Sequence, residues 1–566
     1  MAQLIECVPN FSEGRDMAVM KQITDAIESV EGVTLLDVDP GAATNRTVVT
    51  FVGEPAPVIE AAVRAGRKAA ELIDMSRHHG EHPRFGAMDV CPLVPVANIT
   101  MDETAEFARQ LARRLGEEVG LTIYCYESAA TKPERRNLAT VRAGEYEGLA
   151  DKLKKTEWKP DFGPDRFNAR SGATAVGARD FLVAYNVNLN STSTRRANAI
   201  AFDIREKGRV RREGDPLTGR IVTDANGEPV WEPGSLKCVK GIGWFIEEYG
   251  VAQISMNLTN ISVTPVHVAF DECCAKAQER GIRVTGSEVV GLLPLKSMLE
   301  AGEYFLRKQQ RSLGVSDKEL IKIAVKSMGM DELAPFNPEE KIIEYAIAAK
   351  AGNRKRLVDM TLTDFTHETA SESPAPGGGS IAAACGAFGA ALGTMVANLS
   401  SHKRGWDDRW EEFSEWAVRG KKHHDELLRL IDEDTAAFNR IMDAFGLPKG
   451  TEEEAAARTN AIQEATKGAI ETPLRVMRVA LESMDVARKM AEIGMSASAS
   501  DAGVAALCAR TAVKGAYLNV QINAKDLKDA AARDDFLSRG GQIEEKAEAL
   551  ERDILAIVQK AMTVKS

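Results

Sequence analysis

The spacing of apolar residues changes once along this chain, near residue 356. Before that point, short runs rich in β-branched residues alternate with amphipathic helical stretches, as in "NRTVVTFVG" followed by "APVIEAAVRAGRKAAELI". Such alternation predicts an α/β architecture. From about Arg356 onward, strand signals almost vanish, and stretches rich in Ala, Glu, Leu, Lys and Arg keep helical spacing to the end. The sequence therefore predicts a multi-domain chain in which α/β units precede an all-α helical-bundle domain.

The α/β half divides again at a polar, proline-containing stretch, "KKTEWKPDFGPDRFNARSGA". Because such clusters mark connections between packed units, we expect two α/β (α+β sandwich-like) subdomains with a cleft between them. The predicted boundaries are 1–178 and 179–330 for the two subdomains, 331–355 for a linker and 356–566 for the helical domain. Turn residues around short β runs in "EGDPLTGRIVTDANGEPVWEPG" predict an exposed hairpin-like insertion in the second subdomain.

Composition excludes several classes of protein. The net charge of -11 argues against nucleic-acid binding, which normally needs a basic surplus. The most apolar window, 381–399, is rich in Ala and Gly and suits helix packing inside a bundle, so we expect no membrane span. The eight cysteines lack paired CxxC spacing, and the N-terminus lacks a basic leader. These features predict a reduced, cytoplasmic protein without a zinc site.

Three of the eight histidines, His78, His79 and His82, lie within the five residues of "HHGEH". Pro83 pushes the residue before it to an extended backbone, so these histidines are expected on a loop and not on one helical face. Without a helix to make them converge, and without a carboxylate at a diagnostic spacing, a metal site is not supported. Two interpretations are left: a general base, or loop histidines that only donate and accept hydrogen bonds.

A second cluster of polar residues lies in "DVDPGAATNR". Asp39 follows the predicted strand "VTLLDVD", at the end where open α/β sheets bind ligands. Thr44 and Asn45 add neutral hydrogen-bond donors, and Arg46 adds a cation able to bind a carboxylate. The alternative is an ordinary turn in which Asp and Gly serve as turn formers.

The segment "RSGATAVGAR" combines two arginines with two glycines that allow close approach of the backbone to a ligand. Its candidate residues are Arg170, Gly172, Gly177 and Arg179. Neither GxGxxG nor GxxxxGK[ST] is present, so nucleotide binding is not supported.

In the helical half, apolar residues of "LLRLIDEDTAAFNRIMDAF" recur in steps of three and four and form a stripe. Asp434 occupies one position of this stripe, whereas Asp432 and Glu433 lie off it and are expected to be solvated. A carboxylate directed inward has a raised pKa, as acid/base groups often do. The alternative is a structural carboxylate that pairs with a neighbouring helix. The stripe comprises Leu427, Ile431, Asp434, Phe438, Ile441 and Phe445.

The glycine motif "SPAPGGGS" precedes the Ala-rich helix of the same half. Its residues Gly377, Gly378, Gly379 and Ser380 would expose backbone N–H groups at a helix N-terminus, where an anionic ligand binds favourably. A flexible linker is the alternative.

Six motifs together resemble one family, the bifunctional formimidoyltransferase-cyclodeaminases of histidine breakdown, in the same order and over essentially the whole chain. That resemblance implies transfer of a formimidoyl group from N-formimino-L-glutamate to N5 of tetrahydrofolate. It further implies ring closure to 5,10-methenyltetrahydrofolate with loss of ammonia. The motifs are "LIECVPNFSEGRD", "LLDVDPGAATNRTVVTFVG", "HHGEHPRFGAMDVCPLVPV", "SGATAVGARDFLVAYNVNLNST", "GSEVVGLLPLKSML" and "SPAPGGGSIAAACGAFGAAL".

The resemblance also implies roles for the candidate residues. It places the catalytic histidine at His82, which would take the proton of N5 and later protonate the departing glutamate nitrogen. Under this hypothesis Asp39 orients His82 or binds the amidinium of the donor. Arg46 holds a glutamate carboxylate. The "RSGATAVGAR" segment matches the folate-binding stretch of the family. The catalytic aspartate falls within "LIDEDTAAF", where the stripe selects Asp434.

Tetrahydrofolate, polyglutamylated, is the expected co-substrate, with no metal, and a homo-oligomer is expected. Asn519, Asn523 and Lys525 are possible folate contacts in a C-terminal helix that also resembles the family. The alternative is an N-formylglutamate-using formyltransferase whose helical domain is cyclohydrolase-like or purely structural. A cluster of arginines in the second subdomain is a candidate strip for a polyanionic tail, or a solvated surface: Arg195, Arg196, Arg209, Arg211 and Arg212.

Overall fold

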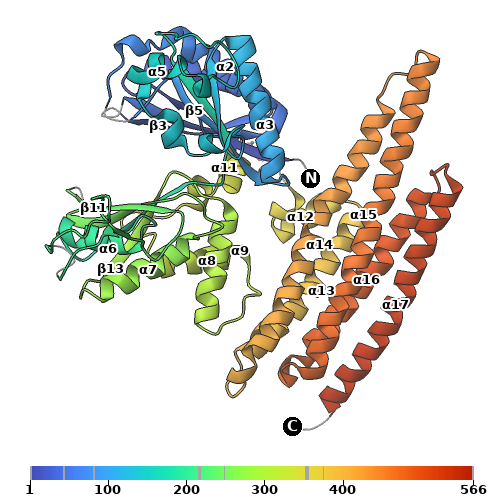
Figure 1. Cartoon of the computed structure of the whole chain (residues 1–566). Coiled ribbons are helices and arrows are strands. Elements are labelled where there is room, and N and C mark those ends of the chain that lie inside the picture. The colour runs from blue at the N-terminus through green and yellow to red at the C-terminus, as the bar shows by residue number, and fades with distance from the viewer. Residues whose placement is uncertain are drawn as a thin grey trace. The chain divides into compact units, whose positions relative to one another are not determined.

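The computed structural model describes residues 3–41, 45–80, 83–214, 218–247, 249–350, 356–373 and 375–563, without the side chain of Lys350. The chain forms two compact units. The first comprises 1–298 with 325–352, and the second comprises 299–324 with 353–566. Figure 1 shows strands and helices in the first unit and long helices in the second. The predicted fold class, α/β followed by all-α, is confirmed.

One mixed sheet forms the first subdomain. Strand β3 pairs with β4, β4 pairs with both β1 and β2, and these two short strands pair in turn with β5. All of these pairs are antiparallel, whereas β5, β7 and β6 run parallel to one another. The strands are β1 (Leu4–Cys7), β2 (Asn10–Phe11), β3 (Val33–Gly41), β4 (Arg46–Gly53), β5 (Met88–Ala97), β6 (Thr122–Glu127) and β7 (Ala173–Ala178).

Helices cover both faces of this sheet. On one face, α1 buries Met20, Ile23 and Ile27, whose three- and four-residue spacing gives the helix a single apolar side. A smaller apolar cluster on the other face includes Val141 and Leu149. The helices of the first face are α1 (Met17–Glu28), α2 (Pro55–Leu72) and α3 (Met101–Arg114), and those of the second are α4 (Leu138–Arg142) and α5 (Glu145–Leu153).

The second subdomain is a four-stranded antiparallel sheet with strand order β11-β12-β8-β13. Helices α6 and α7 pack on one of its faces, against side chains such as Ile254 and Val187. Near the end of the predicted insertion, β10 (Trp231–Glu232) pairs with β9 (Arg209–Val210), which lies just before the insertion. The described side chains of the insertion are mostly exposed. The other elements are β8 (Val183–Leu189), α6 (Thr194–Ile204), β11 (Val239–Ile246), β12 (Val251–Leu258), α7 (Val266–Gln278) and β13 (Val284–Val290).

The units differ from the predicted segment boundaries at two places. Residues 299–324, assigned from sequence to the second subdomain, belong to the helical unit, because Gly314 packs against Ala417 and Lys421 pairs with Asp317 at 2.8 Å. The interval predicted as a linker contains two helices of the first unit, α10 (Pro338–Lys341) and α11 (Ile343–Lys350). The two helices before it are α8 (Leu295–Lys308) and α9 (Asp317–Met328).

Long helices dominate the second unit and run alongside one another in Figure 1. Among the described residues, one helix, α13, is long and apolar enough to cross a membrane, and 67% of that window is buried inside the unit. It packs against α14 and α16. The helices are α12 (Leu362–Thr369), α13 (Gly378–Ser401), α14 (Trp410–Phe445), α15 (Glu452–Ile493), α16 (Ala499–Ala524) and α17 (Ala530–Thr563).

The apolar stripe on α14 is only partly a core face. Leu427 and Ile431 are buried, but Phe438 and Phe445 are 38% and 50% exposed. The facing part of α15, around Ala455–Ala457, is itself exposed, so the C-terminal end of α14 has no apolar core to enter. Asp434 lies where the stripe passes from buried to exposed.

Glu6 on β1 gives the first unit a testable pH dependence. Burial raises the pKa of its carboxyl to about 7, while Arg179 opposes the increase and Glu344 adds to it. A carboxyl whose pKa is higher in the folded state than in the unfolded state makes the protein less stable as pH rises. The loss occurs between the unfolded-state pKa and the folded-state pKa, because the unfolded chain releases the proton first.

We therefore expect Glu6→Gln to raise the thermal unfolding midpoint at pH 8, and to raise it much less at pH 5. Calorimetry at both pH values measures the difference. Glu31→Gln, at an exposed position, is the matched control and should show no such pH dependence. Equal effects of Glu6→Gln at the two pH values would contradict the assignment.

Candidate functional sites

His78 anchors one end of the histidine loop. Its Nε2 lies 2.8 Å from the carbonyl oxygen of Asn45, and Nε of Arg84 lies 3.3 Å from its Nδ1. Because Arg84 can only donate, Nδ1 accepts and the proton is on Nε2. Burial lowers the pKa of His78. The ring is therefore neutral and engaged on both sides, which fits the hydrogen-bonding interpretation and leaves it unsuited to be a base.

Asn45 connects this loop to two others. It adopts a left-handed backbone conformation (φ 47°) directly before β4. Its side-chain oxygen accepts from the backbone N–H of Gly14 at 3.0 Å, and its side-chain nitrogen donates to the carbonyl of His79 at 3.1 Å. The candidate residue Asn45 therefore positions the histidine loop through hydrogen bonds on both sides of its amide.

Arg84 holds the other end of the loop. Its guanidinium donates to Glu147 at 2.7 Å and lies 3.4 Å from Glu145. A pocket of about 470 Å³ opens at this position, lined by His79, Gly80, Arg84, Gly144, Glu145 and Glu147. His82 and Thr44 lie outside the described residues, so their predicted roles stay predictions.

Asp39 lies within β3 and is exposed. The strand pairs antiparallel with β4 and forms an edge of the sheet, so the ligand rule for parallel strands does not apply to it. It lies opposite Val48 of β4, near the end of the β3–β4 hairpin.

Arg46 and Arg142 share one buried carboxylate. Arg46 pairs with Asp89, which is fully buried, and Arg142 donates to the same carboxylate at 2.8 Å. Two guanidiniums around one carboxylate leave an excess positive charge. Nε of Arg142 is buried and has no hydrogen-bond partner among the described groups. The cation predicted at Arg46 is therefore part of a pair of arginines, which the spacing of the sequence did not indicate.

The "RSGATAVGAR" segment is mostly strand β7, and its candidates point to packing. A Cβ at Gly172 would lie 2.1 Å from the carbonyl oxygen of Phe85, and one at Gly177 would lie 2.5 Å from the ring of Tyr126. Both glycines are thus required by close protein contacts. Arg170 and Arg179 flank the strand, whose 6 residues span on the order of 20 Å at about 3.3 Å per residue, so they do not converge on one group.

A polar layer on the second sheet was not predicted. On the face opposite α6 and α7, Nε1 of Trp244 donates to Gln253 at 3.0 Å, and Gln253 donates to Asn188 at 2.7 Å. Glu288 accepts from Gln253 at 3.1 Å and from Asn186 at 2.9 Å. Polar residues at alternate positions of the strand "YNVNLN" were the available signal, because such residues share one face.

Asp434 meets the N-terminus of α13. The Ser380 hydroxyl lies 3.0 Å from Oδ2 of Asp434, and the Ser380 backbone N–H also donates to this carboxylate. Burial raises the pKa of Asp434, and the two hydrogen bonds from Ser380 oppose that increase. A Cβ at Gly379 would lie 2.1 Å from Oδ1 of Asp434, so the carboxylate occupies the space that a side chain there would need.

A pocket of about 120 Å³ joins Asp434 to the glycine motif and to α16. Asn519 and Asn523, two of the three proposed folate contacts, line it, whereas Lys525 is exposed and outside its lining. The pocket brings together side chains from four helices that are far apart in sequence. Its lining residues are Ala375, Gly377, Gly378, Gly379, Asp434, Thr435, Ala437, Phe438, Ile441, Ala469, Asn519 and Asn523.

The two acidic neighbours of Asp434 are not solvated as expected. Asp432 accepts a hydrogen bond from the backbone N–H of Leu357 at 2.6 Å, and Glu433 pairs with Arg475 at 2.7 Å. Both are half-buried, because chain segments before and after α14 pack on its flanks. Asp432 and Glu433 therefore stabilise the packing of α14, and Asp434 is the carboxylate that faces the pocket.

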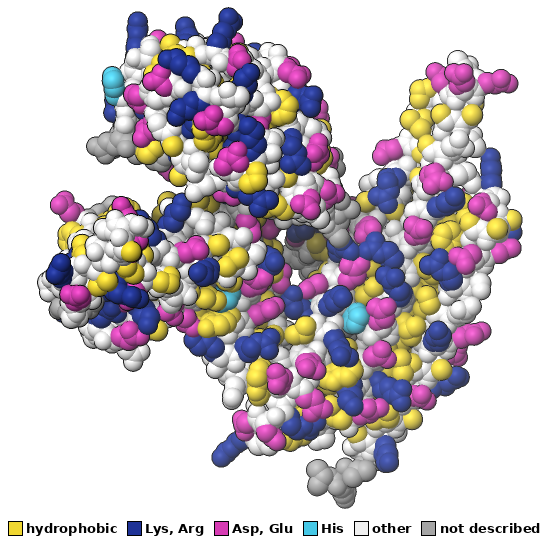
Figure 2. Space-filling model, viewed as in Figure 1, with side chains coloured by type: hydrophobic (Ala, Val, Ile, Leu, Met, Phe, Trp, Pro, Cys, Tyr) yellow, Lys and Arg dark blue, Asp and Glu magenta, His cyan; other side chains and the backbone are white. Residues whose placement is uncertain are grey.

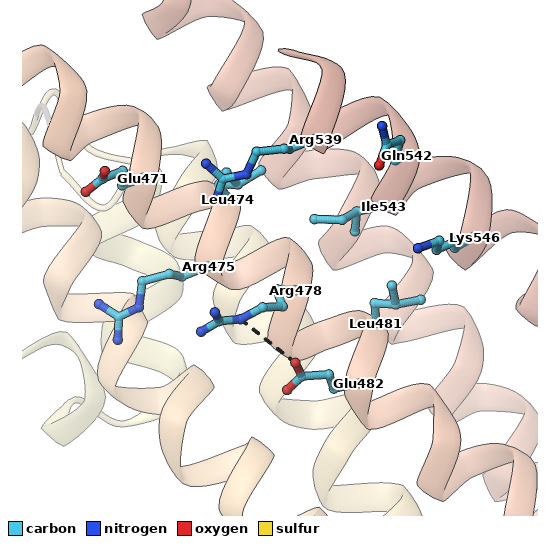
Figure 3. A pocket seen from close by; sticks show the side chains of 10 residues that line it. All are labelled: Glu471, Leu474, Arg475, Arg478, Leu481, Glu482, Arg539, Gln542, Ile543 and Lys546. Atoms are coloured by element: carbon cyan, nitrogen blue, oxygen red, sulfur yellow. Dashed lines mark ion pairs between the residues drawn. The ribbon is translucent and has the colours of Figure 1, made fainter. Parts of the chain in front are cut away.

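A second groove of about 430 Å³ lies between α15 and α17. Figure 3 shows Arg475, Arg478, Arg539 and Lys546 around an apolar floor that includes Leu481 and Ile543. Arg478 lies 3.9 Å from Glu482. Over the visible face of this unit, basic, acidic and apolar side chains are interspersed (Figure 2).

The predicted arginine strip of the second subdomain is largely engaged locally. Arg209 pairs with Asp203, Arg211 pairs with Glu232 at 2.9 Å, and Arg212 donates to the carbonyl of Gly219 at 2.8 Å. Arg195 and Arg196 are exposed on α6. In the part of the chain that the structure describes, no three His, Cys, Asp or Glu side chains are grouped to hold a metal ion.

Comparison with known proteins covers both halves. The model "Formiminotransferase domain, N-terminal subdomain" matches residues 4–179, "Formiminotransferase domain" matches 184–348, and "Formiminotransferase-cyclodeaminase" matches 361–540. The formimidoyltransferase-cyclodeaminase of Gallus gallus is 43% identical over 560 residues, which is 99% of each chain. The chain belongs to the formimidoyltransferase-cyclodeaminase family.

Relatives of each half separately support a bifunctional enzyme. The glutamate formimidoyltransferase of Streptococcus pyogenes is 41% identical over 54% of this chain and 94% of its own length. The methenyltetrahydrofolate cyclohydrolase of Methylorubrum extorquens is 40% identical over 35% of this chain and 96% of its own length. The α/β half of this family member is thus a formimidoyltransferase, and the helical half is a cyclodeaminase.

Asn45→Ala tests the positioning of the histidine loop. Loss of the amide removes its hydrogen bonds to the carbonyl of His79 and to the backbone N–H of Gly14, and leaves the buried N–H of Gly14 unsatisfied, at a cost of about 1–3 kcal/mol to the first unit. We expect the transferase rate to fall at least tenfold while the cyclodeaminase rate, measured on supplied 5-formimino-tetrahydrofolate, stays unchanged. A normal transferase rate in the folded variant would show that Asn45 does not position the loop.

Proposed function

We propose that the two halves act in sequence on folate, each with one acid/base residue. The α/β half transfers the formimidoyl group of N-formimino-L-glutamate to N5 of tetrahydrofolate. The helical half then closes the product to 5,10-methenyltetrahydrofolate and releases ammonia. The observation that carries the residue assignments is the pocket in which Asp434, the glycine motif and Asn519 converge.

In the transferase step we assign the base to His82. N5 attacks the amidine carbon and loses its proton to the imidazole, which then protonates the glutamate nitrogen as the carbon–nitrogen bond to the donor breaks. Support comes from the residues on both sides, since His78 and Arg84 anchor the loop that contains His82. A catalytic base must be held in a fixed position, and hydrogen bonds from the neighbouring residues provide that restraint.

Charged groups of the first subdomain match the charges of the donor. Arg46 and Arg142 around Asp89 carry an excess positive charge that suits a glutamate carboxylate. The exposed carboxylate of Asp39 suits the cationic amidine. Arg170 and Arg179, at the two ends of β7, and the polar layer around Gln253 and Glu288 are proposed folate contacts.

In the cyclodeaminase step Asp434 is the proposed acid. As N10 attacks the amidine carbon on N5, Asp434 protonates the amidine nitrogen and takes back the proton that N10 loses. It then donates that proton as the bond between this carbon and the departing ammonia breaks. Burial favours the protonated form of Asp434, which is the form able to donate. Gly377 and Gly378 leave room for the folate beside it, and Gly379 leaves room for the carboxylate itself.

We further propose a cytoplasmic homo-oligomer that uses polyglutamylated tetrahydrofolate and no metal. The groove between α15 and α17 offers Arg478, Arg539 and Lys546 to a polyanionic tail. A second candidate activity, hydrolysis of methenyltetrahydrofolate by the helical half, is favoured by the 40% identity to a methenyltetrahydrofolate cyclohydrolase.

His82→Ala and Asp434→Ala separate the two steps. The variants are mixed with N-formimino-L-glutamate and tetrahydrofolate, and methenyltetrahydrofolate and ammonia are followed. We expect His82→Ala to lose transfer by at least a hundredfold, and Asp434→Ala to transfer normally and accumulate 5-formimino-tetrahydrofolate. N-formylglutamate as donor and methenyltetrahydrofolate as substrate test the alternatives. If wild type stops at the formimino intermediate, the helical half has another task.

Ser380→Ala tests the protonation state of Asp434. The Ser380 hydroxyl stabilises the charged carboxylate, so its removal raises the pKa of Asp434 further. An acid works only below its own pKa, and the alkaline limb of the cyclodeaminase pH profile should therefore move to higher pH. Ser483→Ala, a buried helix serine bonded to Ala480 outside the pocket, should leave the limb in place. A limb unmoved by Ser380→Ala would remove Asp434 as the acid.

A further inference from the structure

Helix α15 contains a proline near the pocket at Asp434. Pro473 is buried and lies in the interior of this helix of 42 residues. A proline has no backbone N–H, and its ring clashes with the carbonyl of the residue four positions earlier. That residue is Ala469, which lines the pocket. The carbonyl of Ala469 therefore lacks its regular helical partner and needs a donor from another part of the chain.

Asn523 of α16 supplies this donor. Its side-chain nitrogen, Nδ2, donates to the carbonyl oxygen of Ala469 at 2.8 Å. A carbonyl oxygen can only accept, so the contact determines which end of the amide is the nitrogen. The other end, Oδ1, keeps its lone pairs for another donor, and Asn523 lines the pocket. A proline in one helix thus determines the orientation of a side chain on a second helix.

The amide of Asn519, one turn earlier on α16, is oriented in the same way. Its Nδ2 donates to the carbonyl oxygen of Gly515 at 2.9 Å. A Cβ at Gly378 would lie 3.4 Å from this nitrogen and 3.7 Å from Oδ1, so the amide adjoins the glycine motif. The pocket therefore contains two amides that are both held through their nitrogen and that both have an oxygen able to accept.

The rest of the lining limits which part of a folate can bind in this pocket. The described residues that line it include no lysine or arginine, so the carboxylates at the glutamate end of a folate have no cation to pair with there. The pterin end instead presents N–H donors, at N3 and at the 2-amino group, and a flat ring. Amide oxygens suit those donors, and the aromatic side chain of Phe438 offers an apolar surface to the ring.

We propose that Asn519 and Asn523 bind the N3–H and 2-amino donors of the pterin through their Oδ1 atoms, and that Pro473 is a positioning residue for Asn523. A site built to accept from these N–H groups discriminates against a ring that lacks them, because its polar atoms are then left unpaired. The two asparagines would therefore determine specificity for the 2-amino-pyrimidine ring. This inference rests on the proposed location of the cyclodeaminase reaction at Asp434.

Pro473→Ala in the full-length protein separates orientation from packing. Alanine restores an N–H for the carbonyl of Ala469, which releases the amide of Asn523. We expect the thermal unfolding midpoint to stay at or above that of wild type, because alanine favours a helix interior. The KM of the cyclodeaminase for 5-formimino-tetrahydrofolate should rise about fivefold with little change in kcat, as expected when only binding is lost. An unchanged KM would overturn the role of Pro473.

Asn523→Leu tests recognition itself. It removes the acceptor and leaves the carbonyl of Ala469 unsatisfied, so we expect the KM to rise about tenfold and the thermal midpoint to fall. In the double variant Pro473→Ala/Asn523→Leu the carbonyl regains a helical partner, so the midpoint should recover while the KM stays high. Recovery of the KM together with the midpoint would show that Asn523 has only a structural role. Asn460→Leu, at an exposed position of α15, is the control and should leave the KM and the midpoint unchanged.

Inhibition by 5-formyltetrahydrofolate identifies the group that the asparagines bind. This compound keeps the pterin ring but has an oxygen in place of the amidine nitrogen. Its inhibition constant in the cyclodeaminase assay should rise by the same factor as the KM in Asn519→Leu and in Asn523→Leu. An unchanged inhibition constant would assign the asparagines to the amidine and overturn their assignment to the pterin.

The Asp434→Ala variant distinguishes failure of this inference from failure of the proposed function. Full cyclodeaminase activity in Asp434→Ala would show that the reaction occurs elsewhere, and the proposed function would fail. A large loss of activity in Asp434→Ala, with a normal KM in both asparagine variants, would contradict the pterin contacts alone.

Discussion

Close packing of α13 through small residues is the constraint on which the helical half depends. A Cβ at Gly420 of α14 would lie 2.2 Å from Oγ1 of Thr394, and one at Gly389 would lie 2.7 Å from the carbonyl oxygen of Ala505. Helices that approach this closely leave no inward space for large side chains. The large apolar residues of α13 are therefore confined to its outer side, and its N-terminus comes within reach of Asp434. The pocket at Asp434 and the exposed apolar side of α13 are two consequences of one packing arrangement.

The α/β half is organised by buried charge instead. A buried ion is costly unless it is paired and hydrogen-bonded, and each charged group around the histidine loop has such partners. Asp89 accepts from two arginines and from the backbone N–H of Phe85 at 2.9 Å. Arg84 spans His78 and Glu147. The two groups flank the loop from different sides, so its ends are held by interactions that also stabilise the fold.

Local spacing was enough to predict the change of fold class and the position of Asp434, because helical periodicity is a property of neighbouring residues. It was not enough for contacts between distant segments. Asp89, the partner of Arg46, lies 43 residues away, and the ion pair depends on the registers of β4 and β5 with β2, which lies between them. The glycines of β7 suggested a ligand, since sequence does not show that Phe85 and Tyr126 pack against them. Phe438 and Phe445 were expected to face a core. The sequence does not show that the facing part of α15 has no buried apolar side there.

The two proposed steps make opposite demands on protonation, and burial reconciles them. A histidine base works above its pKa, about 6.5 when unperturbed, whereas an acid works below its own. An unperturbed aspartic acid would be protonated to only about 0.1% near pH 7, which is a loss of roughly a thousandfold in active acid. The raised pKa of Asp434 increases the protonated fraction of its carboxyl at a given pH. The hydrogen bonds from Ser380 limit the increase in pKa. If Asp434 is the acid, as proposed, the upper pH limit of the combined reaction is set in the helical half, by how completely water is excluded from this carboxyl.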